Sequence, residues 1–150
     1  MSTGSDTISY HEAPARDIDP VTLYRILRLR VDTFVIEQTA LFSDLDGRDI
    51  EDETLLAWAE EAGEVVATLR VLTDPDVIVI GRVATAPSAR GRGFGGSLMQ
   101  RAVDANRDRP IRIEAQERLS GWYAGFGFEP CGPTYVEDDI LHVPMLRPAG

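Results

Sequence analysis

Residues 90–96, with the sequence Arg-Gly-Arg-Gly-Phe-Gly-Gly, have residue types suited to holding an anion. They follow a β-branched apolar run and precede a helical pattern, so we expect their backbone N–H groups at a helix N-terminus, where such groups contact phosphate oxygens. Glycine permits positive φ angles and lets a ligand approach the backbone closely. Arg90 and Arg92 add charged, fork-shaped donors for the same anion. The stretch therefore predicts a phosphate-binding site.

This glycine loop could be one of three kinds of phosphate-binding site: a P-loop for nucleotides, a dinucleotide-binding loop, or a loop that binds acyl-coenzyme A. A P-loop needs a lysine after its last glycine, whereas Ser97 follows Gly96 and all fifteen cationic residues of the chain are arginines, which excludes that kind. Gly91, Gly93 and Gly96 match the dinucleotide pattern G-x-G-x-x-G. That pattern follows its strand tightly and begins a parallel sheet, whereas here a further stretch intervenes and an antiparallel meander precedes it, which disfavours a dinucleotide. The third kind of ligand is an acyl-coenzyme A.

Hydrophobic periodicity predicts the elements that position this loop. The expected strands are 8–11, 55–60, 65–72, 77–85, 111–115, 134–136 and 140–145, and the expected helices are 20–36, 94–107 and 119–125. A helix separates 77–85 from 111–115, so these two strands should be parallel neighbours, while the three strands before the loop form an antiparallel meander. We predict one α/β (α+β) domain over residues 1–150, with residues 1–7 flexible and a mixed, mostly antiparallel sheet flanked by helices.

The first predicted helix begins at Asp19 and Pro20, an N-cap acid followed by proline at the first helical position. Its apolar stripe is expected at Leu23, Leu27, Val31, Phe34 and Val35. Its other faces are expected to carry Arg25, Arg28 and Arg30. The acid-rich residues 43–64 that follow the helix are expected to form a solvated face or, alternatively, an acidic rim that attracts a cationic amine.

Composition limits the classes of partner. The net charge of −10 argues against nucleic acid, which is bound by basic patches. No apolar run approaches the roughly 20 residues of a membrane span, and the polar N-terminus lacks a secretory signal, so we expect a cytoplasmic protein. Cys131 cannot form an internal disulfide and is expected to be a reduced, packed thiol. The histidines His11 and His142 lie far apart in the sequence, which predicts no metal site.

Two motifs carry a resemblance to a known family. Arg90-x-x-Gly93-x-Gly95 resembles the Q/R-x-x-G-x-G/A signature of the N-acetyltransferase (GNAT) superfamily. The stretch 123–128, Tyr-Ala-Gly-Phe-Gly-Phe, resembles that superfamily's Y-x-x-x-G-F motif, and the resemblance covers about residues 20–145. Within that superfamily the chain more closely resembles the small ElaA-like branch, through the segments 29–30, 34–38, 44–46, 80–83, 115–116 and 137–142.

The resemblance implies a splayed GNAT-like sheet that binds acetyl-CoA or coenzyme A. The backbone of residues 83–85 would pair with the pantetheine arm, so the edge of this strand must be open. The glycine loop would hold the diphosphate. A backbone N–H there would also polarise the thioester carbonyl. Gln116 stands where most of the superfamily has asparagine. The residues so assigned to the coenzyme are Val83, Ala84, Thr85, Arg90, Gly91, Arg92, Gly93, Phe94, Gly95, Gly96 and Gln116.

Tyr123 is the expected general acid under this resemblance. Attack of an amine on the thioester expels a thiolate, and a neighbouring phenol, whose ordinary pKa is near 10, still holds its proton at neutral pH and can donate it. The alternative is that Tyr123 is an aromatic packed beside Trp122 and Phe126.

The group that removes the proton of the attacking ammonium stays open among several side chains. The candidate bases are Glu37, Glu114, Asp138 and His142. Arg30 is expected either to pair with Glu37 or to bind a carboxylate of the substrate, and Arg82 has an equally open role. Arg30, Glu37 and His142 are therefore the candidate substrate residues.

The predicted activity is transfer of an acetyl or other short acyl group from acetyl-CoA to an amine by direct attack. The acceptor would be a small-molecule amine or a peptide amine. The alternative is a non-catalytic acyl-CoA-binding or regulatory module, because fold alone does not fix function. The chain is expected to be a monomer or a homodimer, with the C-terminal hairpin as a candidate dimer contact.

Overall fold

A computed structural model of the chain describes residues 7–39 and 44–150. Its sheet contains the strands β1 (Ile8–Ala13), β2 (Leu55–Glu61), β3 (Glu64–Thr73), β4 (Ile78–Thr85), β5 (Ile111–Gln116), β6 (Glu129–Pro130), β7 (Tyr135–Glu137) and β8 (Ile140–Arg147). The helices are α1 (Pro20–Val31), α2 (Phe94–Ala105) and α3 (Ser120–Ala124), and the short helical segments are η2 (Ala15–Asp17), η3 (Asp32–Glu37), η4 (Arg48–Ile50), η5 (Pro87–Ala89) and η6 (Glu117–Leu119). Residues 1–7 were predicted to be flexible, and residues 1–6 of this segment lie outside the described part.

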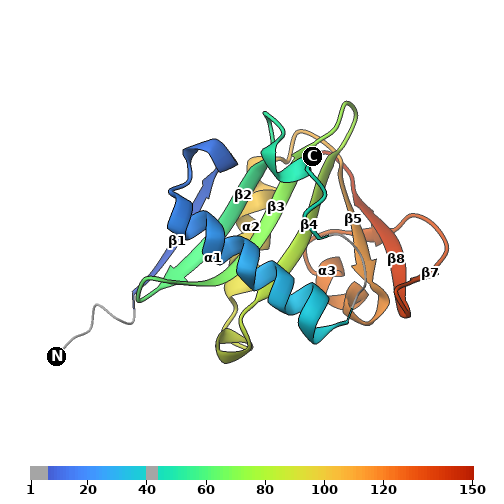
Figure 1. Cartoon of the computed structure of the whole chain (residues 1–150). Helices are drawn as coiled ribbons and strands as arrows, with labels where there is room; N and C mark the ends of the chain where they lie inside the picture. The colour runs from blue at the N-terminus through green and yellow to red at the C-terminus, as the bar shows by residue number, and fades with distance from the viewer. Residues whose placement is uncertain (1–6, 40–43) are drawn as a thin grey trace.

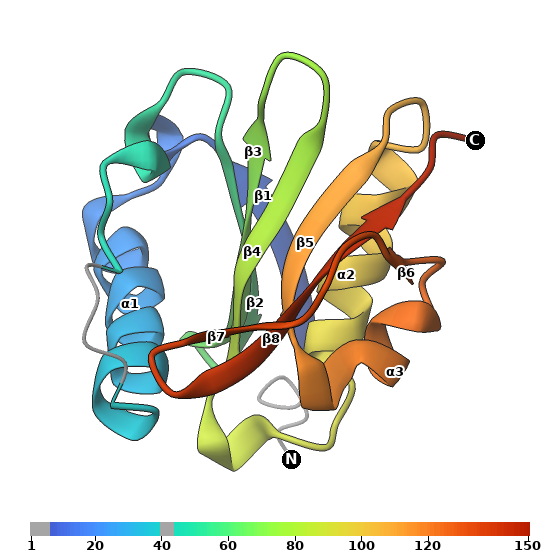
Figure 2. The same cartoon turned by 90° about the vertical axis from the view of Figure 1, so that its right-hand side faces the viewer.

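The eight strands form one sheet in the order β1-β2-β3-β4-β5-β8-β6, with β7 paired to β8. Every neighbouring pair is antiparallel except β4 and β5. This confirms the mixed, mostly antiparallel sheet, the meander before the glycine loop and the parallel neighbours after it. Helix α1 covers one face of the sheet, while α2 and α3 lie on the other (Figures 1 and 2). The short strand β6 was not predicted from the sequence.

Strands β4 and β5 are joined only at one end. Along the described residues, their recorded pairs are Ile78 with Ile111 and Val79 with Arg112. Figure 1 shows the two strands diverging beyond this point. Within β4 the register against β3 shifts, and Arg82 takes a φ of 54°, which marks a β-bulge of the kind found beside active sites. The predicted open, splayed edge at residues 83–85 is therefore present.

Helix α1 begins as predicted, because the Asp19 carboxylate accepts a hydrogen bond from the Thr22 N–H and Pro20 occupies the first turn. After Val31 the chain continues as the π-helical turn η3. The buried face differs from the predicted stripe: the buried residues of α1 are Ile26, Leu29 and Arg30. The prediction that Arg30 lies on an outer face is thus wrong, since only 1% of it is exposed.

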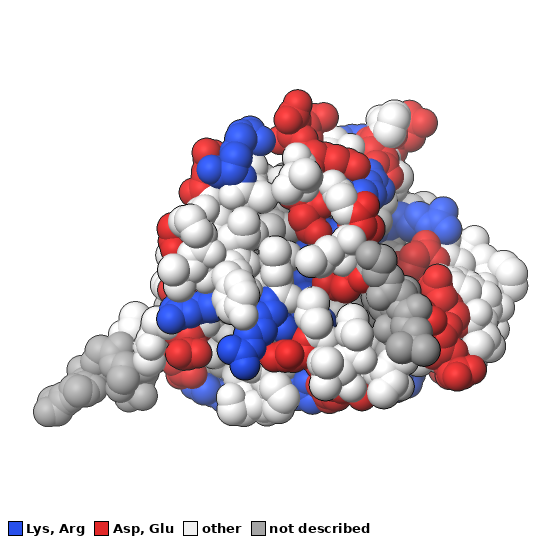
Figure 3. Space-filling view, viewed as in Figure 1, with Lys and Arg blue, Asp and Glu red and all other residues white. Residues whose placement is uncertain are grey.

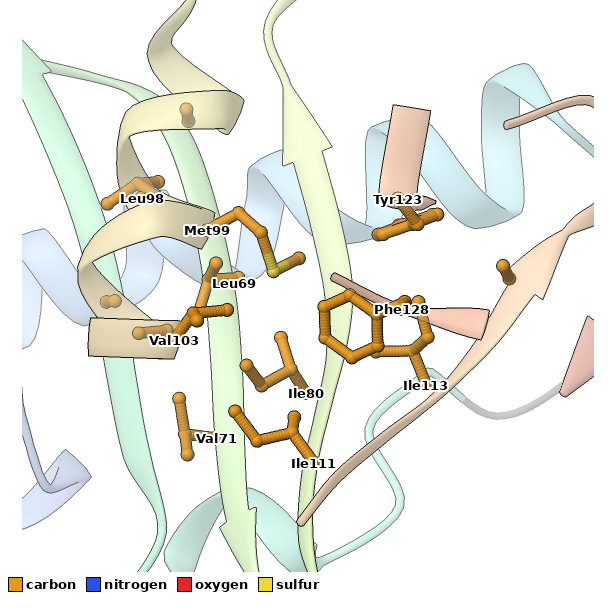
Figure 4. Packing of buried hydrophobic residues seen from close by; sticks show 14 of the residues in the cluster. Leu69, Val71, Ile80, Leu98, Met99, Val103, Ile111, Ile113, Tyr123 and Phe128 are labelled. Carbon is orange, nitrogen blue, oxygen red and sulfur yellow. The ribbon is translucent and has the colours of Figure 1, made fainter. Parts of the chain in front are cut away.

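The main hydrophobic core lies between the sheet and helix α2. Leu98, Met99 and Val103 of α2 pack against sheet residues such as Ile80, and all four are almost fully buried (Figure 4). Because the core holds α2 against β3 and β4, the first turn of α2 is fixed beside the end of β4. The prediction that Cys131 is a packed thiol is wrong, because this residue is exposed in the segment between β6 and β7.

Candidate active site

A pocket of about 850 Å³ occupies the space where β4 and β5 diverge. On the α2 side its walls include the glycine loop and α3, and on the α1 side they include η3 and the polar faces of β5 and β8. The polar and charged residues in this wall include Gln38, Arg70, Arg82, Arg90, Glu114, Gln116, Arg118, Tyr123, Glu137, Asp138 and His142. The pocket therefore has two halves, which meet between the parted strands.

The glycine loop has the geometry expected of an anion cradle. Gly91 and Gly93 have φ angles of 78° and 85°, in the left-handed region that favours glycine. Gly93 is the N-cap of α2, and the first intrahelical bond runs from the Ser97 N–H to the Gly93 carbonyl. The preceding N–H groups of the helix have no partner within the helix, because the first turn of any helix leaves them unpaired. They carry the partial positive charge that attracts an anion.

Replacement of Gly93 by alanine tests whether backbone conformation holds this loop. A Cβ at Gly93 would meet no atom within 4 Å, so any cost comes from the left-handed backbone alone. We expect a loss of about 1–2 kcal/mol in unfolding free energy, measured by urea denaturation. The control is Gly121→Ala, since Gly121 is helical and its Cβ would also meet no atom within 4 Å. Equal effects of the two substitutions would contradict the prediction.

Both arginines of the loop are bound to glutamates. The Arg90 guanidinium donates to both carboxylate oxygens of Glu37 at 2.6 and 2.7 Å, and its Nε donates to the Thr85 carbonyl. Arg92 donates to both oxygens of Glu61 at 2.6 and 2.9 Å. The hydrogen bond from Arg90 lowers the pKa of Glu37 below its ordinary value. Because Glu37 pairs with Arg90, the expected pairing of Glu37 with Arg30 is wrong.

Tyr123 lies in the pocket wall and is 8% exposed. Its ring meets those of Trp122 and Phe128 edge to face, with centroids 4.9 and 6.2 Å away. Figure 4 shows Tyr123 beside Phe128. Burial raises the pKa of Tyr123 to about 12, because desolvation penalises the phenolate. The phenol is therefore protonated at any ordinary pH. The ring of Tyr123 is packed against other aromatic rings, as the alternative prediction expects. Because Tyr123 also lines the pocket, its hydroxyl can still act as a general acid there.

The C-terminal hairpin brings His142 into the α1-side half of the pocket. The His142 Nδ1 lies 2.8 Å from the Ile140 carbonyl, which can only accept, so Nδ1 carries a proton and the neutral ring keeps its lone pair on Nε2. Tyr135 stacks on the imidazole at a centroid distance of 5.5 Å and donates through its hydroxyl to Glu114 at 2.6 Å. This fixes the ring plane of His142.

A buried ion network forms the wall between α1 and the pocket. Its cations are Arg30, Arg70 and Arg82, and its anions are Asp44, Asp46 and Asp49. Arg70 lowers the pKa of Asp46 well below its ordinary value by donating two hydrogen bonds of 2.8 Å. The prediction of a solvated or ligand-attracting acidic face is therefore wrong for Asp44 and Asp49, which are buried among these arginines. Asp46 is exposed, and Arg70 and Arg82 neutralise it. Figure 3 shows acidic and basic side chains interspersed on this side of the molecule.

Arg30 belongs to this network rather than to the pocket. Its guanidinium contacts Asp44 at 3.1 Å and Asp49 at 2.6 Å, and both it and the Asp44 side chain are 1% exposed. It is not among the described residues that line the pocket. Arg30 therefore has a structural role in this network and lies outside the pocket wall in which a substrate residue is expected.

The pocket joins most of the candidate residues and adds others. The glycine loop, Gln116, Tyr123 and His142 all line it, whereas Glu37 and Arg92 are not among the described lining residues. The sequence did not point to Arg70 and Gln38, which line the pocket, or to Tyr135, which stacks on His142. Tyr135 could have been found, because a two-residue turn at Asp138 and Asp139 sets the register that places it opposite His142.

In residues 7–39 and 44–150 no group of three or more histidine, cysteine, aspartate or glutamate side chains could hold a metal ion. No helix in the described part is long and apolar enough to cross a membrane.

Comparison with known proteins agrees with the geometry. The sequence model of a protein family, described as an acetyltransferase (GNAT) domain, matches residues 24–147 of this chain. A UPF0039 protein from Mycobacterium tuberculosis is 43% identical over 139 residues, covering 89% of each chain. The crystal structure of an acyl-CoA N-acyltransferase from Pseudomonas aeruginosa is 36% identical with a TM-score of 0.88, covering 94% of this chain and 99% of that one. The crystal structure of Escherichia coli ElaA is 31% identical with the same TM-score and coverage.

Proposed function

This chain belongs to the acetyltransferase (GNAT) domain family, and on that premise we propose that it transfers an acetyl or other short acyl group from coenzyme A to an amine. The observation that carries the proposal is the meeting of the glycine loop and Tyr123 in one pocket, between strands that have parted. Such a pocket suits a long ligand with an anionic end and an amide-bearing arm. The pocket's other half is open to an acceptor.

In the proposed complex, the N–H groups at residues 91–96 hold the diphosphate of the coenzyme. The free edge of residues 83–85 pairs with the amides of the pantetheine arm, as an added strand would. The register of β4 supports this, because its other edge already pairs with β3 up to Thr85. Gln116 lines the same gap at the end of β5 and can donate to the arm.

The proposed reaction is direct acyl transfer. The amine nitrogen attacks the thioester carbonyl carbon, the C–N bond forms, and the C–S bond breaks. The leaving thiolate takes the proton of the Tyr123 hydroxyl, giving free coenzyme A thiol. The nitrogen loses two protons in all. The first leaves the ammonium for a base on the acceptor side before attack, and the second, lost as the amide forms, returns to the Tyr123 phenolate and restores its hydroxyl. No covalent acyl-enzyme is required.

We propose His142 as that base. Among the earlier candidates, Glu37 is committed to Arg90, which lowers its pKa, and the two oxygens of Glu114 accept from Tyr135 and Arg112. The neutral imidazole of His142 has its Nε2 lone pair available, because Nδ1 donates to the Ile140 carbonyl. Asp138 remains at the pocket rim, on the turn of the hairpin.

Replacement of His142 by alanine is expected to lower kcat at neutral pH by about a hundredfold, a common contribution of a general base. Added imidazole should restore part of the rate, because it can occupy the space over Tyr135 and accept the proton. His11→Ala is the matched control, since His11 also stacks on an aromatic ring, that of Trp58, at the far side of the sheet. An unchanged kcat in the His142 variant would contradict the assignment.

The activity itself is tested by thiol release from acetyl-CoA across a panel of polyamines, amino acids, aminoglycosides and peptides. We expect release that depends on an acceptor, together with acylated amine detected by mass spectrometry. Tight coenzyme A binding without acceptor-dependent release would overturn the enzymatic proposal and favour the non-catalytic binding module.

A further inference from the structure

The two arginines of the glycine loop share one arrangement. Each makes a two-fold hydrogen bond to a glutamate that lies far away in the sequence, Arg90 to Glu37 at the end of η3 and Arg92 to Glu61 at the end of β2. All four side chains are partly exposed, between 19% and 46%. The loop is therefore connected on two sides to elements that belong to different parts of the fold.

The donors of Arg90 are largely committed by this arrangement. A guanidinium has five N–H groups, and its two outer nitrogens form the edge that suits a bidentate oxyanion. In Arg90 that edge is occupied by Glu37, and the Nε–H is occupied by the Thr85 carbonyl. A phosphate would have to displace Glu37 to be held in the same bidentate way. The position of Thr85 in this contact also fixes the loop against the end of β4.

The charge balance of this region also argues against anion binding by the arginine side chains. The two arginines are balanced by two glutamates, so the side chains of this region add little net attraction for an anion. The N–H groups at the start of α2 have no such competitor within the helix. The residue after Glu37 adds a further connection, because the Gln38 amide oxygen accepts from Gln116 at 3.2 Å. The end of η3 thus contacts both sides of the gap, the loop and the end of β5.

We propose that Arg90 and Arg92 are positioning residues, which fasten the glycine loop to η3 and β2 and do not themselves bind the anion. Glu37 and Glu61 are the other halves of these two fastenings. The identity of the anion as the coenzyme A diphosphate rests on the proposed function. The fastening itself does not, because it exists in the ligand-free protein.

The test is whether replacement of Glu37 strengthens or weakens the binding of coenzyme A. If Arg90 is a phosphate ligand, removal of Glu37 frees it and tightens binding. If Arg90 positions the loop, Glu37→Met and Arg90→Met each weaken binding by the same factor, about threefold to tenfold, the range that ordering one long side chain accounts for. The double variant should bind no more weakly than either single variant, because one contact has been removed in all three.

Titration calorimetry of the whole chain with coenzyme A measures these constants, and Arg107→Met is the matched control. Arg107 pairs with Asp104 at 2.6 Å at the far end of α2, so its removal should leave the dissociation constant unchanged. Repetition at higher salt adds a second readout, because a lost guanidinium–phosphate contact would flatten the salt dependence of binding. We expect the same salt dependence in the wild type and in the Glu37→Met/Arg90→Met double variant, which leaves the net charge of this region unchanged.

Amide hydrogen exchange of residues 86–97 without any ligand separates this inference from the proposed function. Glu37→Met and Arg90→Met should accelerate exchange of the loop to the same extent, while Arg107→Met should not. A wild-type chain that binds no coenzyme A would overturn the proposed function, and the exchange rates would still decide the fastening. Tighter binding by Glu37→Met, or unchanged loop exchange in both variants, would overturn the inference.

Discussion

Replacement of Tyr123 by phenylalanine is expected to lower kcat for acyl transfer by about 10²-fold to 10⁴-fold, the usual contribution of a general acid. The substitution removes one hydroxyl and keeps the ring that meets Trp122 and Phe128. Coenzyme A affinity should therefore stay within about twofold of the wild type, because the fold and the glycine loop are unaffected. The measurement pairs steady-state thiol release with calorimetric binding of the coenzyme.

The raised pKa of Tyr123 sets the expected pH dependence. Because burial raises its pKa to about 12, the hydroxyl remains a proton donor throughout the range in which most enzymes are assayed. The same desolvation raises the proton affinity of a thiolate that departs into the same pocket, which keeps the transfer feasible. Tyr123 should thus cause no alkaline loss of activity below about pH 10.

The same shift has a consequence for stability. The pKa of Tyr123 in the folded chain, about 12, lies above the ordinary value of 10.0, so the folded state favours the neutral phenol. That contribution is fully present below pH 10 and is lost as the pH rises through 12. The Tyr123→Phe variant should lack this alkaline loss.

The control for the Tyr123 variant is Tyr24→Phe, since Tyr24 lies exposed on the outer side of α1. It removes the same atom from the same residue type, and we expect no change in kcat. A Tyr123→Phe variant that keeps kcat within about threefold would contradict the general-acid role and leave the tyrosine as a packed aromatic. A shared loss in both variants would indicate a general fault of the protein preparation.

The order of elements and their pairing were predictable because each depends on local pattern. Alternating apolar residues set the strands of the meander, and the helix between 77–85 and 111–115 required parallel neighbours. The same pattern placed a glycine loop at the start of α2. The strand β6, Glu129–Pro130, is too short to carry a period and exists through its pairing with Leu146 and Met145.

The candidate site was predictable where motifs determine it and not where distant segments meet. The glycine loop and Tyr123 were found from short motifs and line one pocket. Arg30 was misplaced because a helical stripe says which residues are apolar, but not that a loop 14 and 19 residues onward supplies carboxylates to a buried guanidinium. The glutamate partner of Arg90, 53 residues away in the sequence, has no local signal either.

The ion network links this misplaced residue to the site. Asp46 holds Arg70 through two hydrogen bonds and also contacts Arg82, and both arginines line the pocket. Arg82 occupies the bulge of β4, where its positive φ must be maintained by its surroundings. The network therefore sets the shape of the pocket wall opposite β5, and Arg30 anchors it from α1.

Replacement of Arg30 by methionine is expected to lower the unfolding free energy by about 3–5 kcal/mol. Methionine fills similar space but leaves the buried carboxylates of Asp44 and Asp49 without their shared cation, and an uncompensated buried charge is costly. Since small domains are stable by only about 5–15 kcal/mol, this is a large part of the total. Urea denaturation followed by circular dichroism measures the change.

Arg28→Met is the matched control, because Arg28 lies on the same helix with an exposed partner, Asp32, four residues onward. Such a surface pair contributes little, so we expect a change below about 0.5 kcal/mol. If Arg30→Met fails to fold, Arg30→Lys gives a measurable intermediate, since an ammonium keeps the charge but cannot reproduce the fork that reaches both aspartates. A small, equal effect of the Arg28 and Arg30 substitutions would mean that the buried network does not stabilise the fold, and that its role is confined to placing Arg70 and Arg82 in the pocket wall.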